Sequence, residues 1–167
     1  ERSQTLIELM PRTMISTTTI RMPHFIEECA PKIVRYHPGE VEWLITGDTK
    51  TPPETRELCE SVSEKSGIPV KYFNIQDQEK RLKDWPELLK LVPYKSYVRK
   101  LLGNFIAYLE GCDTLVMLDD DNFLADNDFI SLHNIVGKSK PIPLIKSQSS
   151  WFNAAEAFIE ERGIPFY

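Results

Sequence analysis

The sequence predicts an α/β domain, in which a mainly parallel sheet is flanked by helices. Two observations predict it: four short runs rich in β-branched or apolar residues alternate with longer amphipathic stretches, and the last of those runs is almost wholly apolar. The chain has 167 residues, of which 41% are hydrophobic and 27% charged, as is usual for a globular protein with a substantial core. We therefore expect a single domain over residues 1–167.

The four runs are the expected strands, at residues 14–20, 41–46, 70–75 and 114–118. Pro23 follows the first, Gly47 and Asp48 follow the second, and a Gly-Ile-Pro turn at 67–69 introduces the third. The fourth run is so apolar that we expect both of its faces to be buried.

The stretches between the runs predict helices at residues 24–36, 53–66, 86–91, 94–110, 127–136 and 154–162. The clearest is 94–110, where apolar residues recur at i, i+3, i+4 and i+7. That stripe places Arg99, Lys100 and Gly103 on the opposite, outward face. Residues 76–93 are polar and rich in proline punctuation, so we expect a surface excursion that holds only the short helix at 86–91.

Composition excludes several classes of protein. The three cysteines are isolated, which argues against a disulfide scaffold and against a structural zinc site. A formal net charge of −5 argues against general nucleic-acid binding. No apolar run approaches the roughly 18 residues of a membrane span. Because the sequence also lacks an N-x-[ST] glycosylation acceptor, we expect a cytoplasmic protein.

Three adjacent carboxylates, Asp119, Asp120 and Asp121, follow the fourth expected strand. A hard divalent cation would relieve their repulsion, since Mg²⁺ and Mn²⁺ prefer carboxylate and phosphate oxygens. Ligands of open parallel sheets bind beyond the carboxyl ends of the strands, where this triad falls. Alternation along an extended chain directs Asp119 and Asp121 to one side and Asp120 to the other. A solvated acidic turn is the alternative, which the apolar strand before the triad makes less favoured.

The helix before that strand supplies the opposite charge. Residues 78–100 hold seven basic and three acidic side chains, whereas residues 111–128 hold six acidic side chains and no basic one. A diphosphate could bridge a metal at the triad and the guanidinium of Arg99, the alternative being a solvated helix face. Two further features would lie at the same edge of the sheet. They are the hydroxyls at 16–19 with Arg21, at the end of the first strand, and Asp48, after the second strand. By themselves these two features are also explained by β-propensity and by a turn.

Taken together, these residues resemble the GT-A-type nucleotide-sugar glycosyltransferases, and within them the reversibly glycosylated polypeptides, the plant UDP-arabinopyranose mutases. Four stretches match in order, at residues 44–49, 96–103, 118–125 and 162–166. The last of them is similar to the R-G-x-P-F element of that group. The resemblance implies a GT-A-like, Rossmann-like fold.

The resemblance also implies a role for particular residues. Asp121 would coordinate Mn²⁺ or Mg²⁺, Asp119 would contact the metal or the ribose, and Asp120 the donor sugar. Arg99 would contact the diphosphate or the sugar and, with Asp120, take part in catalysis. The nucleotide end of the pocket would be formed by Thr17, Thr18, Thr19 and Asp48, and the sugar or acceptor side by Trp151, Asn153 and Arg162.

We therefore expect a metal-dependent glycosyltransferase that uses a nucleotide-diphosphate sugar, by preference a UDP-sugar, and an unknown acceptor. A UDP-sugar mutase is the nearest alternative, but the reactive Arg of that group lies beyond the R-G-x-P-F element and has no counterpart here. We accordingly expect a domain shortened at its C-terminus, for which a non-catalytic sugar-nucleotide-binding module is a further alternative. Two other enzyme classes are less favoured. A phosphohydrolase would carry its D-x-D motif on an early strand, whereas here the motif follows the fourth expected strand. A nucleotidyltransferase would show a Gly-rich loop near the N-terminus, and none is present.

Overall fold

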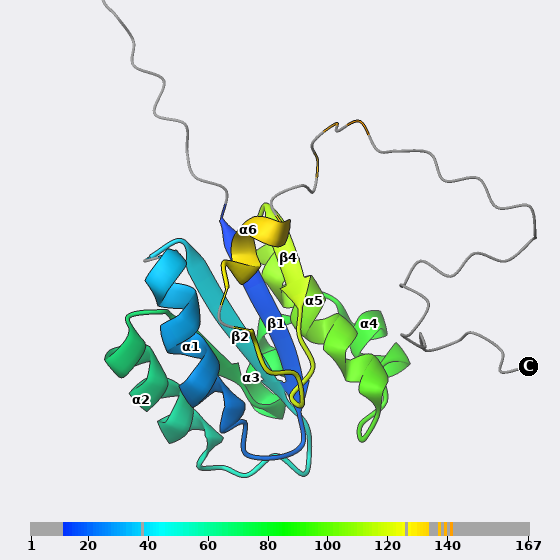
Figure 1. Ribbon diagram of the computed structural model, residues 1–167. Helices are drawn as coiled ribbons and strands as arrows, with labels where there is room; N and C mark the ends of the chain where they lie inside the picture. Colours follow the sequence, from blue (N-terminus) through cyan, green and yellow to red (C-terminus); the bar gives the residue numbers. More distant parts are fainter. Residues whose placement is uncertain are drawn as a thin grey trace, which may run out of the picture.

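A computed structural model describes residues 12–37, 39–125 and 127–133, with the single residues 137, 139 and 141. Four strands form one sheet of order β3-β2-β1-β4, and every pair in it is parallel. The strands are β1 (Thr13–Thr19), β2 (Val41–Gly47), β3 (Val70–Phe73) and β4 (Thr114–Met117). Helices flank this sheet (Figure 1), so the predicted α/β class with a parallel sheet is confirmed.

The described helices form two layers, one on each face of the sheet. They are α1 (Phe25–Tyr36), α2 (Thr55–Ser66), α3 (Ile75–Arg81), α4 (Pro86–Leu91), the 3₁₀ turn η1 (Tyr97–Arg99), α5 (Lys100–Leu109) and α6 (Phe129–His133). Helices α1 and α2 pack with Trp43 and Ile45 of the sheet, whereas α5 packs with Met14 and Leu44. Alternate residues of one strand thus enter different cores, as the pleat requires.

Strand register aligns the segments that follow β1 and β4. Ser16 pairs with Met117, the last residue of β4, and the Leu118 amide donates to the Ser16 carbonyl at 3.0 Å. Residues 118–121 therefore continue beside the end of β1. On the other side, Thr19 pairs with Gly47, so that β1 and β2 end at the same level. The carboxyl ends of three strands meet at one edge of the sheet.

The segment after β3 differs from the prediction. The third strand ends at Phe73, and α3 follows within a stretch that we expected to be a surface excursion. Asn74 and Asp77 form a capping box that starts this helix. Gln78 is fully buried. Its amide compensates for the loss of water by donating to the carbonyls of Gly47 at 2.7 Å and Phe73 at 2.9 Å. A polar side chain thus anchors α3 to the ends of two strands.

The expectation that both faces of the fourth strand are buried holds only for part of the strand. Within the described residues β4 pairs only with β1, at an edge of the sheet, and the side chain of Met117 is 61% exposed. Val116 enters the core formed with α1 and α2, and the half-buried Leu115 packs against the core formed with α5. Both faces of β4 therefore meet a core at these positions, and only the carboxyl end of the strand, at Met117, faces solvent.

The outward face assigned to the 94–110 helix was also wrong. The helix starts only at η1, and both Arg99 and Gly103 are buried, whereas Tyr97 and Leu101 of the apolar stripe are exposed. Gly103 explains this rotation. A Cβ atom there would lie 2.5 Å from Thr46 Oγ1, so the bare glycine lets α5 approach the sheet on this side. The expected helix at 127–136 is described as α6, and that at 154–162 lies outside the described residues.

Candidate functional site

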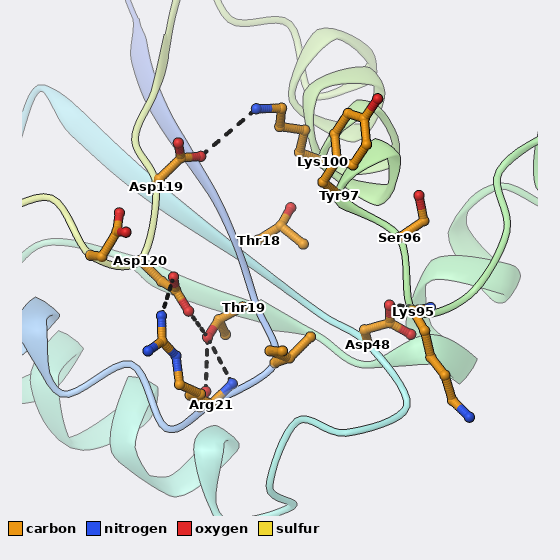
Figure 2. Close-up of a pocket in the computed structure, with 12 residues that line it drawn as sticks. Thr18, Thr19, Arg21, Asp48, Lys95, Ser96, Tyr97, Lys100, Asp119 and Asp120 are labelled. Atoms are coloured by element: carbon orange, nitrogen blue, oxygen red, sulfur yellow. Dashed lines mark hydrogen bonds and ion pairs between the residues drawn. The ribbon is translucent and has the colours of Figure 1, made fainter. Parts of the chain in front are cut away.

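A cavity of about 390 Å³ lies at the carboxyl ends of the strands. Four segments of the chain form it: the end of β1, Asp48 after β2, the residues from Lys95 to the start of α5, and the acidic triad after β4 (Figure 2). Its lining residues are Thr18, Thr19, Ile20, Arg21, Asp48, Lys95, Ser96, Tyr97, Lys100, Asp119, Asp120 and Asp121. Of the residues predicted from the sequence, the structure brings seven to this cavity: Thr18, Thr19, Arg21, Asp48, Asp119, Asp120 and Asp121.

Asp120 is bound to the end of β1. Its Oδ2 atom accepts a hydrogen bond from the Thr19 hydroxyl at 2.7 Å, and its Oδ1 atom accepts one from Arg21 at 3.1 Å. Asp119 instead faces Lys100 across the cavity, with 3.8 Å between Oδ1 and Nζ (Figure 2). Neighbouring carboxylates of the triad therefore take different directions. These contacts hold the triad beside β1 while leaving Asp119 largely exposed to solvent.

The triad fits a metal ion only in part. In the part of the chain that the structure describes, no three His, Cys, Asp or Glu side chains converge into a metal site. Asp119 and Asp121 both line the cavity, but Asp120 is engaged by Thr19 and Arg21. Mg²⁺ is commonly held by one or two carboxylates together with substrate phosphates and water. The donor set fits a hard divalent cation that arrives with a phosphate ligand.

Asp48 forms the opposite wall, and its side chain is only 2% exposed. Its Oδ1 atom accepts the Thr49 amide proton and its Oδ2 atom that of Lys95, both at 2.6 Å. Lys95 has φ 57°, a left-handed conformation that side chains other than glycine seldom adopt. The carboxylate of Asp48 thus holds the backbone of this wall in an uncommon conformation.

Arg99 lies behind that wall and outside the lining of the cavity. Its side chain is 2% exposed, its Nη2 atom donates to Gln78 Oε1 at 2.5 Å, and its Nε atom lies 4.0 Å from Asp48 Oδ1. The guanidinium also lies over the ring of Tyr94, 4.7 Å from the centroid. A buried charge needs such partners, because leaving water without them is costly. The structure therefore does not bring Arg99 to a position where it would touch a ligand in the cavity.

Thr17 also lies away from the cavity. It is buried on the opposite face of β1, where its hydroxyl accepts a hydrogen bond from Trp43 Nε1 at 3.1 Å. Trp151, Asn153 and Arg162, expected on the sugar or acceptor side, lie outside the described residues. Thr18, in contrast, lines the cavity, and its buried hydroxyl has no hydrogen-bond partner among the described residues.

Sequence reasoning missed Lys95 and Tyr97 as lining residues and assigned no role to Lys100. The signal for the two lysines was the excess of basic residues at 78–100, which we assigned to Arg99 instead. Periodicity placed Tyr97 in an apolar stripe, and nothing in the sequence indicates that it faces this cavity.

Comparisons with known proteins do not assign this chain to a family. Neither the protein-family models nor the curated proteins match this chain. None of the helices that the structure describes is both long and apolar enough to cross a bilayer. The cavity and the residues that line it are consequently the features that bear on function.

Proposed function

We propose that this protein binds a nucleotide-diphosphate sugar together with Mn²⁺ or Mg²⁺ and transfers the sugar to an acceptor. One observation carries the proposal: exposed carboxylates and an exposed lysine line the same cavity at the carboxyl ends of parallel strands, beside Thr18, whose buried hydroxyl has no partner among the described residues. A ligand that is anionic, binds divalent cations and also carries hydroxyl groups matches all three features. A nucleotide-diphosphate sugar has this chemistry. The resemblance of the sequence to enzymes of UDP-sugars makes a UDP-sugar the preferred candidate.

In this proposal each wall of the cavity has its own task. Asp119 and Asp121 bind the metal from one side, and Asp120, held by Thr19 and Arg21, keeps their loop against β1. The metal, when bound, supplies neutralisation of the negative charge that develops on the leaving diphosphate. Thr18 donates to or accepts from the nucleotide, and Asp48 shapes the nucleotide end through Lys95.

A non-catalytic module that only binds a sugar nucleotide is the second candidate. One observation favours it: among the described residues no histidine lines the cavity, and its carboxylates are Asp48 and the triad. Asp48 and Asp120 are held by hydrogen bonds, and the remaining two are the proposed metal ligands. A base that would deprotonate an acceptor hydroxyl is therefore not assigned within the described residues.

A calorimetric titration with UDP and GDP, with and without Mn²⁺, tests the binding part of the proposal. We expect Mn²⁺ to strengthen UDP binding at least about tenfold, since charge-assisted contacts contribute about 1.5–3 kcal/mol each. Asp121→Asn should remove most of that gain. Asp84→Asn changes an exposed aspartate outside this cavity and serves as the matched control. Affinity that is independent of the metal, or no binding of either nucleotide, would contradict the proposal.

Incubation with UDP-sugars then separates the catalytic from the non-catalytic candidate. Release of UDP that depends on Mn²⁺ and is lost in Asp121→Asn supports a transferase. A rearranged UDP-sugar without release of UDP indicates a mutase instead. Tight binding with the UDP-sugar recovered unchanged, in the presence of a range of sugar and peptide acceptors, supports the binding module.

A further inference from the structure

We propose that Lys100, rather than Arg99, receives the diphosphate, and that Asp119 holds Lys100 until metal and nucleotide arrive together. The inference rests on the proposed function. It adds an exchange of ion-pair partners within the cavity: Asp119 exchanges Lys100 for the metal, and Lys100 then turns to a phosphate oxygen.

The cations around this cavity differ in how accessible they are to a ligand. Arg99 is buried behind the wall, bonded to Gln78, and Arg21 is paired with Asp120. Lys95 contributes to the lining, but its side chain extends away from Thr18 and Asp119 (Figure 2). The ammonium of Lys100 instead points across the cavity toward Asp119, with 41% of its side chain exposed. Lys100 is thus the lining cation best placed to meet an anion in the cavity.

The contact that Lys100 already makes with Asp119 is weak. The Lys100–Asp119 pair is long, at 3.8 Å, and both side chains are exposed. Exposed ion pairs of this kind change an equilibrium by at most about fivefold. A diphosphate oxygen and a divalent cation are each stronger partners than the two side chains are for one another. The pair is therefore strong enough to hold Lys100 over the cavity and weak enough to be exchanged.

Because Asp119 and Lys100 are paired with each other, a ligand that binds one of them also affects the other. When Asp119 takes a metal it frees Lys100, and when Lys100 takes a phosphate it frees Asp119. Each ligand thus frees a binding group for the other. This effect adds to the direct contact between the metal and the diphosphate. Because coupling between two ligands is reciprocal, UDP should strengthen Mn²⁺ binding by the same factor as Mn²⁺ strengthens UDP binding.

The test compares two carboxylates of one loop. Asp119→Asn and Asp121→Asn each remove one negative charge from the cavity, but only Asp119 pairs with Lys100 among the contacts of the described residues. Without metal, Asp119→Asn should bind UDP up to about fivefold more tightly than Asp121→Asn does. Lys100→Met should abolish that difference, because no ammonium is left to be released. With Mn²⁺, Lys100→Met should weaken UDP binding at least about tenfold and Lys100→Arg much less.

Binding of Mn²⁺ alone, followed by electron paramagnetic resonance, gives a readout without nucleotide. Lys100→Met should bind Mn²⁺ as tightly as the parent or up to about fivefold more tightly, since Asp119 is freed. A simple loss of structure would weaken Mn²⁺ and UDP together. Thermal unfolding of Lys100→Met should match the parent, because the side chain is exposed.

The failures are distinguishable. If the parent binds UDP with Mn²⁺ and Lys100→Met binds it equally well, the role of Lys100 is overturned while the proposed function stands. Equal metal-free affinities in Asp119→Asn and Asp121→Asn overturn the partner exchange. If the parent does not bind UDP in the presence of Mn²⁺, the proposed function falls and the inference falls with it.

Discussion

Asp48 and Asp119 lie on opposite walls of one cavity and differ in their surroundings. The side chain of Asp48 is 2% exposed and accepts two backbone amide protons, with Arg99 behind it. The side chain of Asp119 is 67% exposed, and Lys100 is its one ion-pair partner among the described residues. The wall at Asp48 is complete without a ligand, whereas the wall at Asp119 leaves carboxylate oxygens free. We propose that the buried wall sets the shape of the site and that the exposed wall binds the ligand.

This difference separates stability from binding. A buried carboxylate that loses its partner remains uncompensated, which destabilises the fold. An exposed carboxylate loses little stability when its partner is removed, because water replaces the contact. Substitutions on the buried wall should therefore lower the free energy of unfolding, and substitutions on the exposed wall should lower affinity for the ligand.

The largest effect is expected for Arg99→Met. It leaves the carboxylate of Asp48 and the Oε1 atom of Gln78 buried without their cation, which should lower the free energy of unfolding by about 3–5 kcal/mol. Urea denaturation measures this change. Lys100→Met is the matched control on the exposed wall and should stay within about 0.5 kcal/mol of the parent. A loss below about 1 kcal/mol in Arg99→Met would show that the two walls do not differ as described.

A smaller loss is expected for Gly103→Ala, at the contact of α5 with the sheet. The new Cβ atom would lie 2.5 Å from Thr46 Oγ1 and 2.9 Å from Ser16 Oγ, so α5 or the sheet must move. Overpacking of this kind costs about 1–3 kcal/mol. The double variant Gly103→Ala/Thr46→Ala should regain part of the loss, since it removes the nearer atom. Strictly additive losses in thermal unfolding would argue against the close approach.

Asp120→Asn should have an intermediate effect on both properties. Asp120 joins the exposed triad to β1 through Thr19 and Arg21, so the substitution weakens two hydrogen bonds and should cost about 1 kcal/mol of stability. We also expect weaker UDP binding in the presence of Mn²⁺, because the neighbouring carboxylates are positioned less well. Denaturation and calorimetry on the same protein measure both. A change in one property alone would mean that the contacts of Asp120 with β1 do not position the triad.

The smallest effect is expected away from the cavity, at His37. Burial lowers the pKa of this histidine, but hydrogen bonds to Glu40 at 2.9 Å and Asp128 at 2.6 Å outweigh it and raise the pKa above the ordinary 6.5. Since the folded pKa lies above the unfolded one, the stabilisation is fully present below about pH 6.5 and is lost as the pH rises through the folded value. Proton NMR titration of the imidazole measures its pKa in the folded protein.

His37→Gln provides the control for that pH dependence. The variant should show a flatter dependence of stability on pH above 6.5, because its side chain does not titrate. Nucleotide binding should be unaffected, since His37 lies outside the lining of the cavity. The same slope in the variant and the parent would assign the pH dependence to another group.

Much of the fold could be predicted from local patterns. Alternating apolar runs and amphipathic stretches gave the class, and the position of Asp119, Asp120 and Asp121 after a strand placed them at the right edge of the sheet. The start of α3 also had a local signal, since Asn74 and Asp77 have the spacing of a capping box. That signal was overlooked because the following residues are polar.

The burial of Arg99 could not be predicted in this way. Its partners Gln78 and Asp48 are distant in the sequence and meet it only in the folded chain. Apolar periodicity assigned the wrong face to α5, because the closest approach to the sheet is made by Gly103, which periodicity does not weigh. Local patterns therefore identified the exposed wall of the cavity and Asp48 of the buried wall, and failed on Arg99 behind it.

The central claim is that the exposed wall binds a metal and a nucleoside diphosphate together. Its most direct test is the affinity for UDP of the parent and of Asp121→Asn, each measured with and without Mn²⁺. The account predicts that Mn²⁺ strengthens binding to the parent at least about tenfold and has little effect on the variant, while both unfold at the same temperature. Equal strengthening in the two proteins, or UDP binding to the parent that Mn²⁺ leaves unchanged, would contradict it.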